Sequence, residues 1–323
     1  WWSVVDGTVR VPTGARPVVV GSPQWVEALR TSRVIVTNDH LPSWFSKREG
    51  QHLLQTWHGT PIKKLLHDAP RAVTLRYRRL MDRQVPQWDL LLAQSPQAGR
   101  RLQQALGYRG PVRVGEYPRN VRLLGGAEVR RRVRHELGIA PGQPVILYAP
   151  TWRESLRPST GAAGCAAAHG PGPVGALDGP RLAELLDAVV LMRSHHMNRA
   201  GCVPGMIDVS GYPSVEELML AADILVSDYS SIFFDFALTG KPAVVYAPDL
   251  ASYRDVERGL YGDWPLGSGL PVAADHDELA SHLQRLLGDI DVAEGCHSPL
   301  EVEPAPILDN LTWIRGWIAR FLS

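Results

Sequence analysis

The feature that most constrains this chain is a repeated alternation of short apolar segments with polar stretches of helical spacing. The apolar segments have the length of strands and occur in two successive series. The first series is Val18–Val20, Val34–Val36, Leu53–Thr56, Leu90–Ala93 and Val112–Val114, and the second is Val145–Ala149, Val189–Met192, Ile224–Ser227 and Ala243–Ala247. Alternation of this kind is typical of parallel α/β folds. We therefore predict two α/β units in succession.

The length of 323 residues suits two domains of roughly 150 residues each. We place the boundary after the Arg-rich stretch 128–137, where Pro141-Gly142 interrupts the pattern. The predicted units are therefore residues 1–138 and residues 139–323. Within the second unit, residues 155–180 hold 6 Gly, 6 Ala and 4 Pro in 26 positions. That composition buries no core and predicts a mobile loop.

The chain ends in an apolar stripe at helical spacing. Its members are Ile314, Trp317, Ile318, Phe321 and Leu322. The spacing predicts a final amphipathic helix, which we assign to the second unit. Packing on a core is the favoured role of this stripe, and a helix on a membrane surface is the alternative.

The net charge of +1 hides a strong division along the chain. Residues 1–136 hold 23 Lys/Arg and 10 Asp/Glu, a net charge of +13, whereas residues 137–323 hold 11 and 23, a net charge of −12. The division predicts one unit that faces an anionic partner, and nucleic acid, an anionic membrane or a polyphosphate polymer would each suit it. Residues 71–83 contain five arginines among apolar side chains. This segment predicts either a membrane-facing helix or a solvated one.

The sequence shows neither a disulfide framework nor a membrane-spanning segment. Its three cysteines are odd in number and lack metal-ligand spacing, which favours a reducing compartment. No apolar run approaches the roughly 18 residues that cross a bilayer, and no signal peptide is visible. We therefore expect a cytoplasmic protein. Because the chain begins with Trp1 rather than methionine, an upstream segment remains an open possibility.

Side chains suited to binding phosphate follow several of the predicted strands. They are His58 and Lys63, Arg119, Thr151 and Arg153, and Arg193 with His195. The carboxyl ends of parallel strands are where open α/β sheets bind their ligands. An imidazole that titrates near neutrality suits a general base, and an arginine suits a phosphate clamp. For His58, a hydrogen-bonded turn histidine is the structural alternative.

A further anion site is predicted where the strand Ile224–Ser227 runs into a turn. A helix from Ile232 to Thr239 follows that turn. Ser230 and Ser231 therefore stand at a helix N-terminus, where free backbone N–H groups bind anions. Simple capping of the helix by both serines is the alternative.

Four sequence blocks combine these features. They are Gln55-Thr-Trp-His-Gly-Thr-Pro-Ile-Lys63, Tyr117-Pro-Arg-Asn120, Tyr148-Ala-Pro-Thr-Trp-Arg153 and Val226-Ser-Asp-Tyr-Ser-Ser-Ile-Phe-Phe-Asp-Phe-Ala237. In this order they resemble the CDP-glycerol glycerophosphotransferase family, the polymerases and primases of teichoic acid synthesis. The resemblance extends over roughly residues 18–285.

The resemblance implies an α/β fold of two facing Rossmann-like domains, the GT-B type architecture of nucleotide-dependent glycosyltransferases. It implies that a polyol hydroxyl attacks the β-phosphorus of CDP-glycerol, or of CDP-ribitol, and that CMP leaves. His58 would be the general base, and His195 would stabilise the pyrophosphate of the donor. The expected substrate-binding residues are Gly59, Thr60, Lys63, Arg119, Thr151, Arg153, Arg193, Asp228, Ser230, Ser231 and Asp235.

The resemblance also implies a lipid-linked polyol-phosphate acceptor on the basic first unit, close to an anionic membrane. We therefore expect an enzyme that is peripheral on the inner face of the cell membrane and has no nucleic-acid partner. We expect no metal or other cofactor, and the His195-His196 pair lacks the Cys or carboxylate partners of a zinc site. A nucleotide-sugar glycosyltransferase of the same fold and a catalytically silent, polymer-binding homologue remain the alternatives. The oligomeric state stays open.

Overall fold

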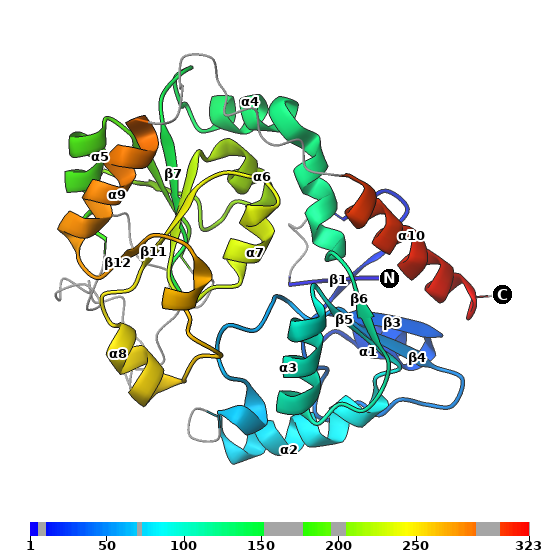
Figure 1. Cartoon of the computed structure of the whole chain (residues 1–323). Coiled ribbons are helices and arrows are strands. Elements are labelled where there is room, and N and C mark those ends of the chain that lie inside the picture. The colour runs from blue at the N-terminus through cyan, green and yellow to red at the C-terminus, as the bar shows by residue number, and fades with distance from the viewer. Residues whose placement is uncertain (6–10, 70–72, 152–176, 195–204, 289–303, 323) are drawn as a thin grey trace, which may run out of the picture.

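The computed structural model describes residues 1–5, 11–69, 73–151, 177–194, 205–288 and 304–322. These residues form two α/β units, each built on its own parallel sheet (Figure 1). The strands are β1 (Trp2–Val4), β2 (Pro17–Val19), β3 (Val34–Thr37), β4 (His52–Gln55), β5 (Leu90–Ala93), β6 (Val112–Val114), β7 (Val145–Tyr148), β8 (Val189–Met192), β9 (Ile207–Asp208), β10 (Ile224–Ser227), β11 (Ala243–Tyr246) and β12 (Val272–Ala273).

The helices connect these strands and cover the sheets. The α-helices are α1 (Pro23–Thr31), α2 (Leu75–Gln84), α3 (Pro96–Leu106), α4 (Gly126–Glu136), α5 (Gly179–Leu186), α6 (Val215–Ala221), α7 (Ile232–Ala237), α8 (Leu250–Ser252), α9 (His276–Gly288) and α10 (Pro304–Ala319). Shorter 3₁₀ segments include η1 (Leu66–Asp68), η2 (Val85–Gln87) and η3 (Pro118–Gly125). Ser residues cap several helix starts, as Ser22 and Ser95 do by accepting from the backbone of α1 and α3.

The first sheet contains four parallel strands in the order β3-β4-β5-β6. Its register is given by the pairs Val34 with His52, Leu54 with Leu90, and Leu91 with Val112. One face packs against α1, α2 and α3, and the other packs against α10. Because both faces are covered, the central strand β5 is buried at every residue and is apolar throughout.

The second sheet contains six parallel strands in the order β12-β11-β10-β7-β8-β9. Helices α4, α6 and α7 pack on one face, and α5 and α9 pack on the other. From the central pair β7 and β10, the chain adds β8 and β9 on the side of β7, and β11 and β12 on the side of β10. A doubly wound sheet binds its ligand at such a switch point, in the crevice beyond the carboxyl ends of the strands. The carboxyl ends of β7 and β10 are therefore the expected ligand edge of this unit.

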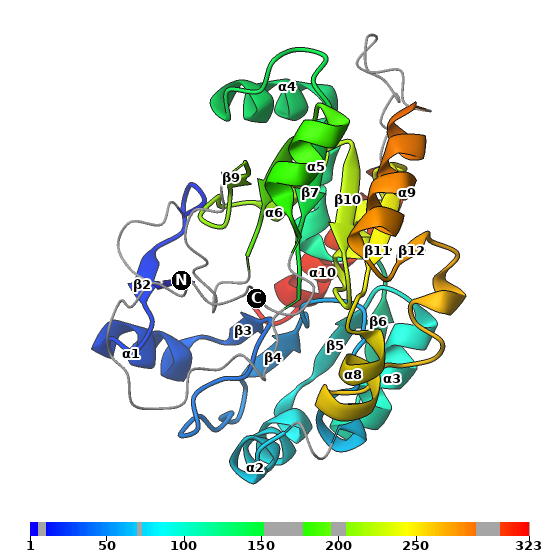
Figure 2. The same ribbon diagram turned by 90° about the vertical axis from the view of Figure 1, so that its left-hand side faces the viewer.

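The two units meet at the carboxyl ends of their strands. Gly59, Gln94 and Arg119 follow β4, β5 and β6, and each of them contacts Ser231 or Asp235 of the second unit. Figure 2 shows the sheets in separate layers, with β3, β4 and β5 below β7, β10 and β11. This arrangement confirms the predicted fold class of two facing Rossmann-like units.

The chain crosses between the units at two places that differ from the predicted division. Helix α4 packs on α6, and its Val133 lies in the core of the second unit. Helix α10 packs on the first sheet, where Ile314 and Trp317 contact a core that includes Leu54. The assignment of α4 to the first unit and of the C-terminal helix to the second was therefore wrong. Helical spacing reveals which side of a helix is apolar, and it does not reveal which sheet covers that side.

All of the predicted strands are present, with ends shifted by one residue at most. Within the described residues, the segment at Val18–Val20 pairs with β1 in a separate two-stranded sheet, outside the four-stranded one. The prediction missed β1, β9 and β12, which have two or three residues each. Most of the predicted loop 155–180 lies outside the described residues, and its last residues begin α5. The helix predicted to end at Thr239 ends at Ala237.

Candidate active site

The turn after β4 brings the first unit into direct contact with the second. Gly59 has a φ of +154°. A Cβ at this position would lie 2.0 Å from Ser231 Oγ and 2.6 Å from Ser231 Cβ. Only glycine therefore permits this close approach. The contact places the predicted base His58 beside the predicted anion-binding turn of the opposite unit.

The His58 ring has a defined tautomer. Its Nδ1 lies 2.9 Å from the carbonyl oxygen of Asn38. A carbonyl only accepts hydrogen bonds, so Nδ1 carries the hydrogen and the neutral ring keeps its lone pair on Nε2. The ring also stacks on Trp57, with 4.5 Å between the ring centroids. The hydrogen bond and the stacking together fix the direction in which Nε2 points.

The surroundings of His58 favour its neutral form. Part of the side chain is exposed to solvent, yet protein atoms crowd the ring, and this desolvation lowers its pKa below the usual value. The hydrogen bond to Asn38 and the charge of Asp39 oppose the shift, whereas the charges of Arg119 and Lys63 add to it. The net direction is downward, so the imidazole is unprotonated at neutral pH, as a general base requires.

Arg119 follows β6 and is held on two sides. Its Nε and Nη2 donate to Asp235 Oδ2 at 3.2 and 2.6 Å. The guanidinium carbon lies 4.7 Å from the centroid of the Tyr117 ring. The Arg119 side chain keeps 30% of its area exposed, so the same group can reach a phosphate bound between the units.

Asp228 lies at the switch point of the second sheet, where it connects two loops. This buried residue follows β10, and its Oδ1 accepts from the backbone N–H groups of Thr151 and Tyr229 at 2.9 and 2.6 Å. Its carbonyl accepts from Trp264 Nε1 at 3.1 Å. Asp228 therefore ties the loop after β7 to the loop after β10. The substrate-binding role predicted for Asp228 stays a prediction beside this structural one.

The hydroxyl groups of Ser230 and Ser231 have different partners. Ser230 Oγ accepts from the N–H of Ile232 at 3.3 Å and so caps the first turn of α7. Ser231 is the N-cap residue of α7, but its side chain makes no capping bond. Capping therefore accounts for Ser230 alone, and Ser231 is set apart by its contact with Gly59.

Arg193 and Lys63 also have structural partners. Arg193 Nη1 donates to the carbonyl oxygens of Val209 and Tyr212 at 3.1 and 2.9 Å. Lys63 pairs through its backbone with Leu260 in an antiparallel bridge, which joins the first unit to the second. The phosphate-binding roles of Arg193 and Lys63 stay predictions.

Two of the predicted site residues, His195 and Arg153, lie outside the described residues. The donor side of the site is therefore described through Thr151, Asp228 and the two serines. The roles given to His195 and Arg153 stay predictions.

Sequence reasoning missed Gln94 and Glu116, which lie at the centre of the contact between the units. Thr60 Oγ1 donates to Gln94 Oε1 at 2.7 Å. Gln94 Nε2 donates to Glu116 Oε2 at 3.2 Å and to Asp235 Oδ1 at 2.9 Å. Gln94 directly follows β5 and Glu116 comes two residues after β6. The positional rule that singled out His58 would therefore have found both.

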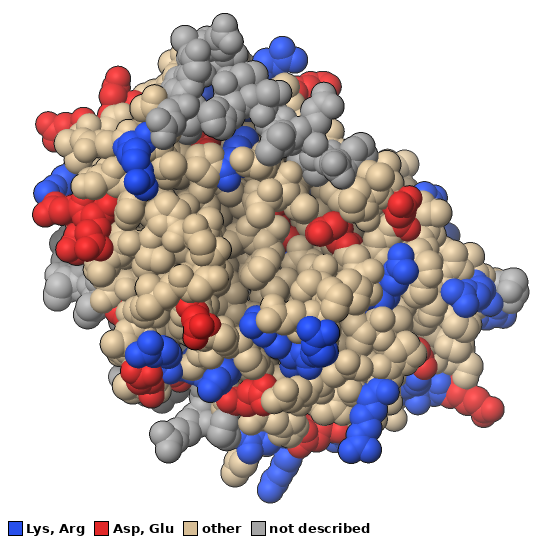
Figure 3. Space-filling model, viewed as in Figure 1, with Lys and Arg blue, Asp and Glu red and all other residues tan. Residues whose placement is uncertain are grey.

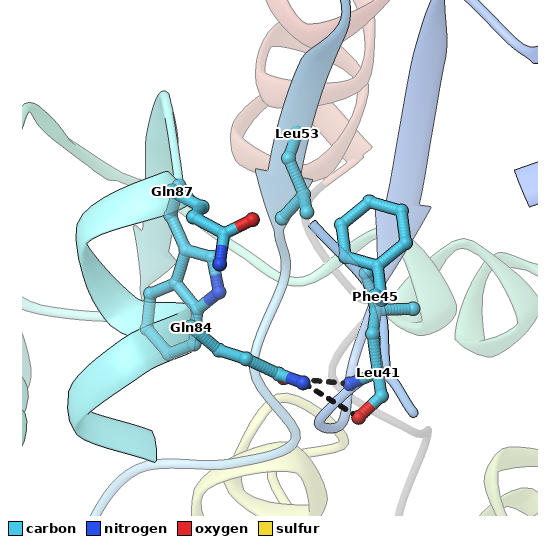
Figure 4. Close-up of a pocket in the computed structure, with 6 residues that line it drawn as sticks. Leu41, Phe45, Leu53, Gln84 and Gln87 are labelled. Atoms are coloured by element: carbon cyan, nitrogen blue, oxygen red, sulfur yellow. Dashed lines mark hydrogen bonds between the residues drawn. The ribbon is translucent and has the colours of Figure 1, made fainter. Parts of the chain in front are cut away.

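A small crevice in the first unit contains none of the predicted site residues (Figure 4). Its lining residues are Leu41, Phe45, Leu53, Gln84, Gln87 and Trp88. The Gln84 amide bonds both the N–H and the carbonyl of Leu41, and Gln87 Oε1 accepts from the N–H of Lys47. These bonds tie the loop after β3 to α2 and η2, so the crevice is a packing feature of this loop.

The charge division of the sequence is visible on the surface. Lys and Arg side chains gather over α2 and α3 on the face shown in Figure 3. Both helices belong to the segment 1–136, whose net charge is +13. The basic face therefore lies on the unit that carries His58.

The described part of the chain contains neither a cluster of metal-binding side chains nor a membrane-spanning helix. No three His, Cys, Asp or Glu side chains among these residues gather closely enough to hold a metal ion. Within the same ranges, every helix is too short or too polar to cross a bilayer.

The chain is similar to known proteins over most of its length. A family model described as CDP-Glycerol:Poly(glycerophosphate) glycerophosphotransferase matches residues 1–294. The teichoic acid poly(glycerol phosphate) polymerase of Bacillus spizizenii is 31% identical over 253 residues, covering 75% of this chain and 63% of the polymerase. The teichoic acid glycerol-phosphate transferase of Staphylococcus aureus is 30% identical over 277 residues, covering 82% of this chain and 70% of the transferase.

The chain spans less than two thirds of the length of the polymerases that it matches, 63% in Bacillus spizizenii and 36% in Bacillus subtilis. Among solved structures, a variant of the wall teichoic acid polymerase TagF has a TM-score of 0.79 and 26% identity, covering 99% of this chain and 82% of that chain. A crystal of such a variant soaked with CDPG gives a TM-score of 0.78 at 26% identity.

Proposed function

Because the chain belongs to the CDP-Glycerol:Poly(glycerophosphate) glycerophosphotransferase family, we propose that it transfers glycerol phosphate, or a similar polyol phosphate, from a CDP-linked donor to a teichoic-acid-like acceptor. CMP is the second product. The relatives support this reaction class, since those described above are polymerases or transferases of teichoic acid glycerol phosphate. The family match includes both units and the contact between them.

The observation that carries the proposal is the orientation of His58. Because its Nδ1–H is held by Asn38, Nε2 is free to accept a proton at the contact between the units. In the proposed step, the acceptor hydroxyl gives its proton to Nε2 while its oxygen forms a bond to the β-phosphorus of the donor. The bond from that phosphorus to the bridging oxygen breaks, and CMP leaves with the electron pair.

Transfer of a phosphoryl group depends mainly on positioning and on stabilisation of negative charge. We assign the donor phosphates to the crevice of the second unit, with Arg119 reaching them from the first. The residues that share this proposed role are Arg119, Thr151, Arg153, Arg193, His195, Ser230 and Ser231. The arginines of this set would supply positive charge there, so we propose that the reaction needs no metal ion. Full activity in EDTA would support this, and a loss that Mg²⁺ restores would refute it.

We also propose that the basic first unit faces a lipid-linked polyol-phosphate acceptor at the inner face of the cell membrane. Helix α2 exposes Leu75, at 66% of its area, together with Arg76 and Arg79. Apolar and basic side chains on one exposed helix favour binding to an anionic lipid surface. The test is cosedimentation with vesicles that contain phosphatidylglycerol. Binding that is lost in the Arg76→Glu/Arg79→Glu variant, and absent with neutral vesicles, is the expected result.

The function is tested by CMP release from CDP-glycerol and from CDP-ribitol, with a lipid-linked glycerol-phosphate acceptor. Acceptor-dependent release from one donor is expected and identifies the polyol. A panel of nucleotide sugars is assayed beside them. Transfer from a nucleotide sugar, or binding of acceptor polymer without any transfer, would replace the proposal by one of the two alternatives.

A further inference from the structure

The Asp235 carboxylate accepts as many hydrogen bonds as its two oxygens hold. Oδ1 accepts from Gln94 Nε2 at 2.9 Å and from Asn120 Nδ2 at 3.0 Å. Oδ2 accepts from Nε and Nη2 of Arg119 at 3.2 and 2.6 Å. Four donors fill the lone pairs of a carboxylate. The residue is also only 4% exposed, so a substrate hydroxyl has neither a vacant acceptor nor access.

All of these donors come from the opposite unit. Asp235 lies on α7, whose Ile232 and Phe236 belong to the core of the second unit. Gln94 follows β5, and Arg119 and Asn120 begin the segment after β6. One carboxylate thus joins the ends of two strands of the first sheet to the second unit, across more than 110 residues of sequence.

The same network continues to the proposed base. Gln94 uses its carbonyl to accept from Thr60 Oγ1 at 2.7 Å. Thr60 belongs to the turn His58-Gly59-Thr60, and Arg119 Nη2 lies 4.0 Å from the position of a Cβ on Gly59. Asp235 is therefore two hydrogen bonds away from the turn that carries the base, and one away from the arginine beside it.

The first unit holds these donors in place on its own side. Glu116 Oε2 accepts from Gln94 Nε2 and Asn120 Nδ2, both at 3.2 Å. The Glu116 carbonyl in turn accepts from Asn310 Nδ2 on α10 at 2.7 Å. Gln94 and Asn120 thus keep one carboxylate partner within their own unit, and Asp235 supplies the partner from the other unit.

We propose that Asp235 is a positioning residue that sets the alignment of the two units, and that it does not bind substrate. It holds Arg119 and, through Gln94, the His58-Gly59-Thr60 turn opposite Ser231 and the donor crevice. The inference rests on the proposed function for its kinetic consequences, whereas its structural consequences are independent of the reaction. It replaces the substrate-binding role that the sequence predicted for Asp235.

The decisive variant is Asp235→Asn, which keeps the shape and removes the charge and one acceptor. A misplacement of reacting groups by about 1 Å lowers rates about 10²-fold, so we expect kcat to fall about 100-fold. The Kd for CDP-glycerol should rise much less, because Arg119 is displaced but still present. The control is Asp277→Asn, because Asp277 is exposed on α9 and, among the described residues, its carboxylate pairs with the surface residue Arg181. This control should match the wild type. A rise in Kd equal to the fall in kcat/KM would make Asp235 a substrate ligand, and an unchanged kcat would also overturn the proposal.

A second variant tests the path through the glutamine. Gln94→Leu removes the link to Thr60 but leaves the bonds between Arg119 and Asp235. It should lower kcat less than Asp235→Asn, and the double variant should be no slower than Asp235→Asn alone, because both changes act through one network. Fully multiplicative effects would contradict the path. If Asp235→Asn does not fold, the kcat and Kd of Gln94→Leu decide by the same criteria.

Amide hydrogen exchange separates this inference from the proposed function. Asp235→Asn should increase exchange in peptides that contain residues 58–60 and 116–121, and Asp277→Asn should not. This result would support the alignment role even if the wild type released no CMP from any CDP-linked polyol. Unchanged exchange in both peptides would overturn the alignment role whatever the activity.

Discussion

Two buried aspartates of the second unit hold arginines, and they do so in different settings. Asp223 accepts from Arg130 and Arg134, which lie on α4 and pack in the same core. Asp235 accepts from Arg119 and its neighbours across the contact between the units. Both carboxylates accept hydrogen bonds from arginine. The arginines that bind Asp223 pack in the same unit, whereas the arginine that binds Asp235 belongs to the other unit.

The surroundings of Asp223 show a site that stabilises one unit. Arg130 and Arg134 also donate to carbonyl oxygens at the C-terminal end of α6, from Leu220 to Ala222. Lys241 Nζ donates to the same helix end, and burial lowers the pKa of this lysine to about 7. Positive groups at a helix C-terminus are favourable. The comparison teaches that a buried arginine–aspartate pair serves stability when its partners share a core, and alignment when they belong to different units.

The largest expected effect is a loss of kcat at the contact between the units, where Asp235 lies. His58→Ala removes the proposed base, and loss of a general base lowers kcat about 10²- to 10⁴-fold. Binding of CDP-glycerol should remain that of the wild type, because the described contacts of the ring, with Asn38 and Trp57, lie within the first unit. The control is His67→Ala, an exposed histidine that pairs with Asp82. Equal kcat in His58→Ala and wild type would remove His58 from the mechanism.

Gly59→Ala tests the same contact by steric means. The added methyl would overlap Ser231 Oγ and Cβ, so the units must separate, and we expect about a 10²-fold loss of kcat/KM. The double variant Gly59→Ala/Ser231→Gly removes the overlapping atoms and should recover part of the activity. Activity of the single variant near that of the wild type would show that the units do not approach this closely in the working enzyme.

Asp223→Asn should show the opposite pattern to Asp235→Asn. Removing one partner of a buried ion pair costs about 3–5 kcal/mol, and Arg130, Arg134 and Asp223 are all nearly buried. Urea unfolding should therefore report a large loss of stability. The kcat of the folded variant, measured well below its unfolding temperature, should change little. A loss of kcat larger than that of Asp235→Asn would erase the distinction between the two aspartates.

The smallest effect concerns pH. The His58 pKa is lowered, chiefly by desolvation, and the base works only when unprotonated. The rate constant kcat/KM should therefore persist as the pH falls to the usual histidine pKa of about 6.5, and decline only below it. The measurement is the pH profile of kcat/KM for CMP release. An acidic limb centred above pH 7 would contradict the assignment of that limb to His58.

The sequence predicted the local structure well because local patterns determine it. The apolar runs that became β5, β7 and β10 are buried strands, and the polar residues after strands β4 and β6 lie at the site. The partners of Asp235 were not predictable in this way, because Gln94 lies 141 positions away in sequence. A buried carboxylate near a serine turn fits substrate binding as well as alignment until its donors are known. The packing side of α10 was missed for the same reason.

The position of α10 has a consequence for the order in which the protein is made. Chains emerge from the ribosome from the N-terminus, and domains generally fold as they appear. Leu54 and Leu90 of the first sheet are covered by Ile314 and Trp317, and Asn310 bonds the Glu116 carbonyl. Of these two units, the one that is synthesised first is therefore completed only after the second has been made. Until α10 has left the ribosome, one face of the first sheet stays uncovered, and this nascent state is the one that chaperones would be expected to protect.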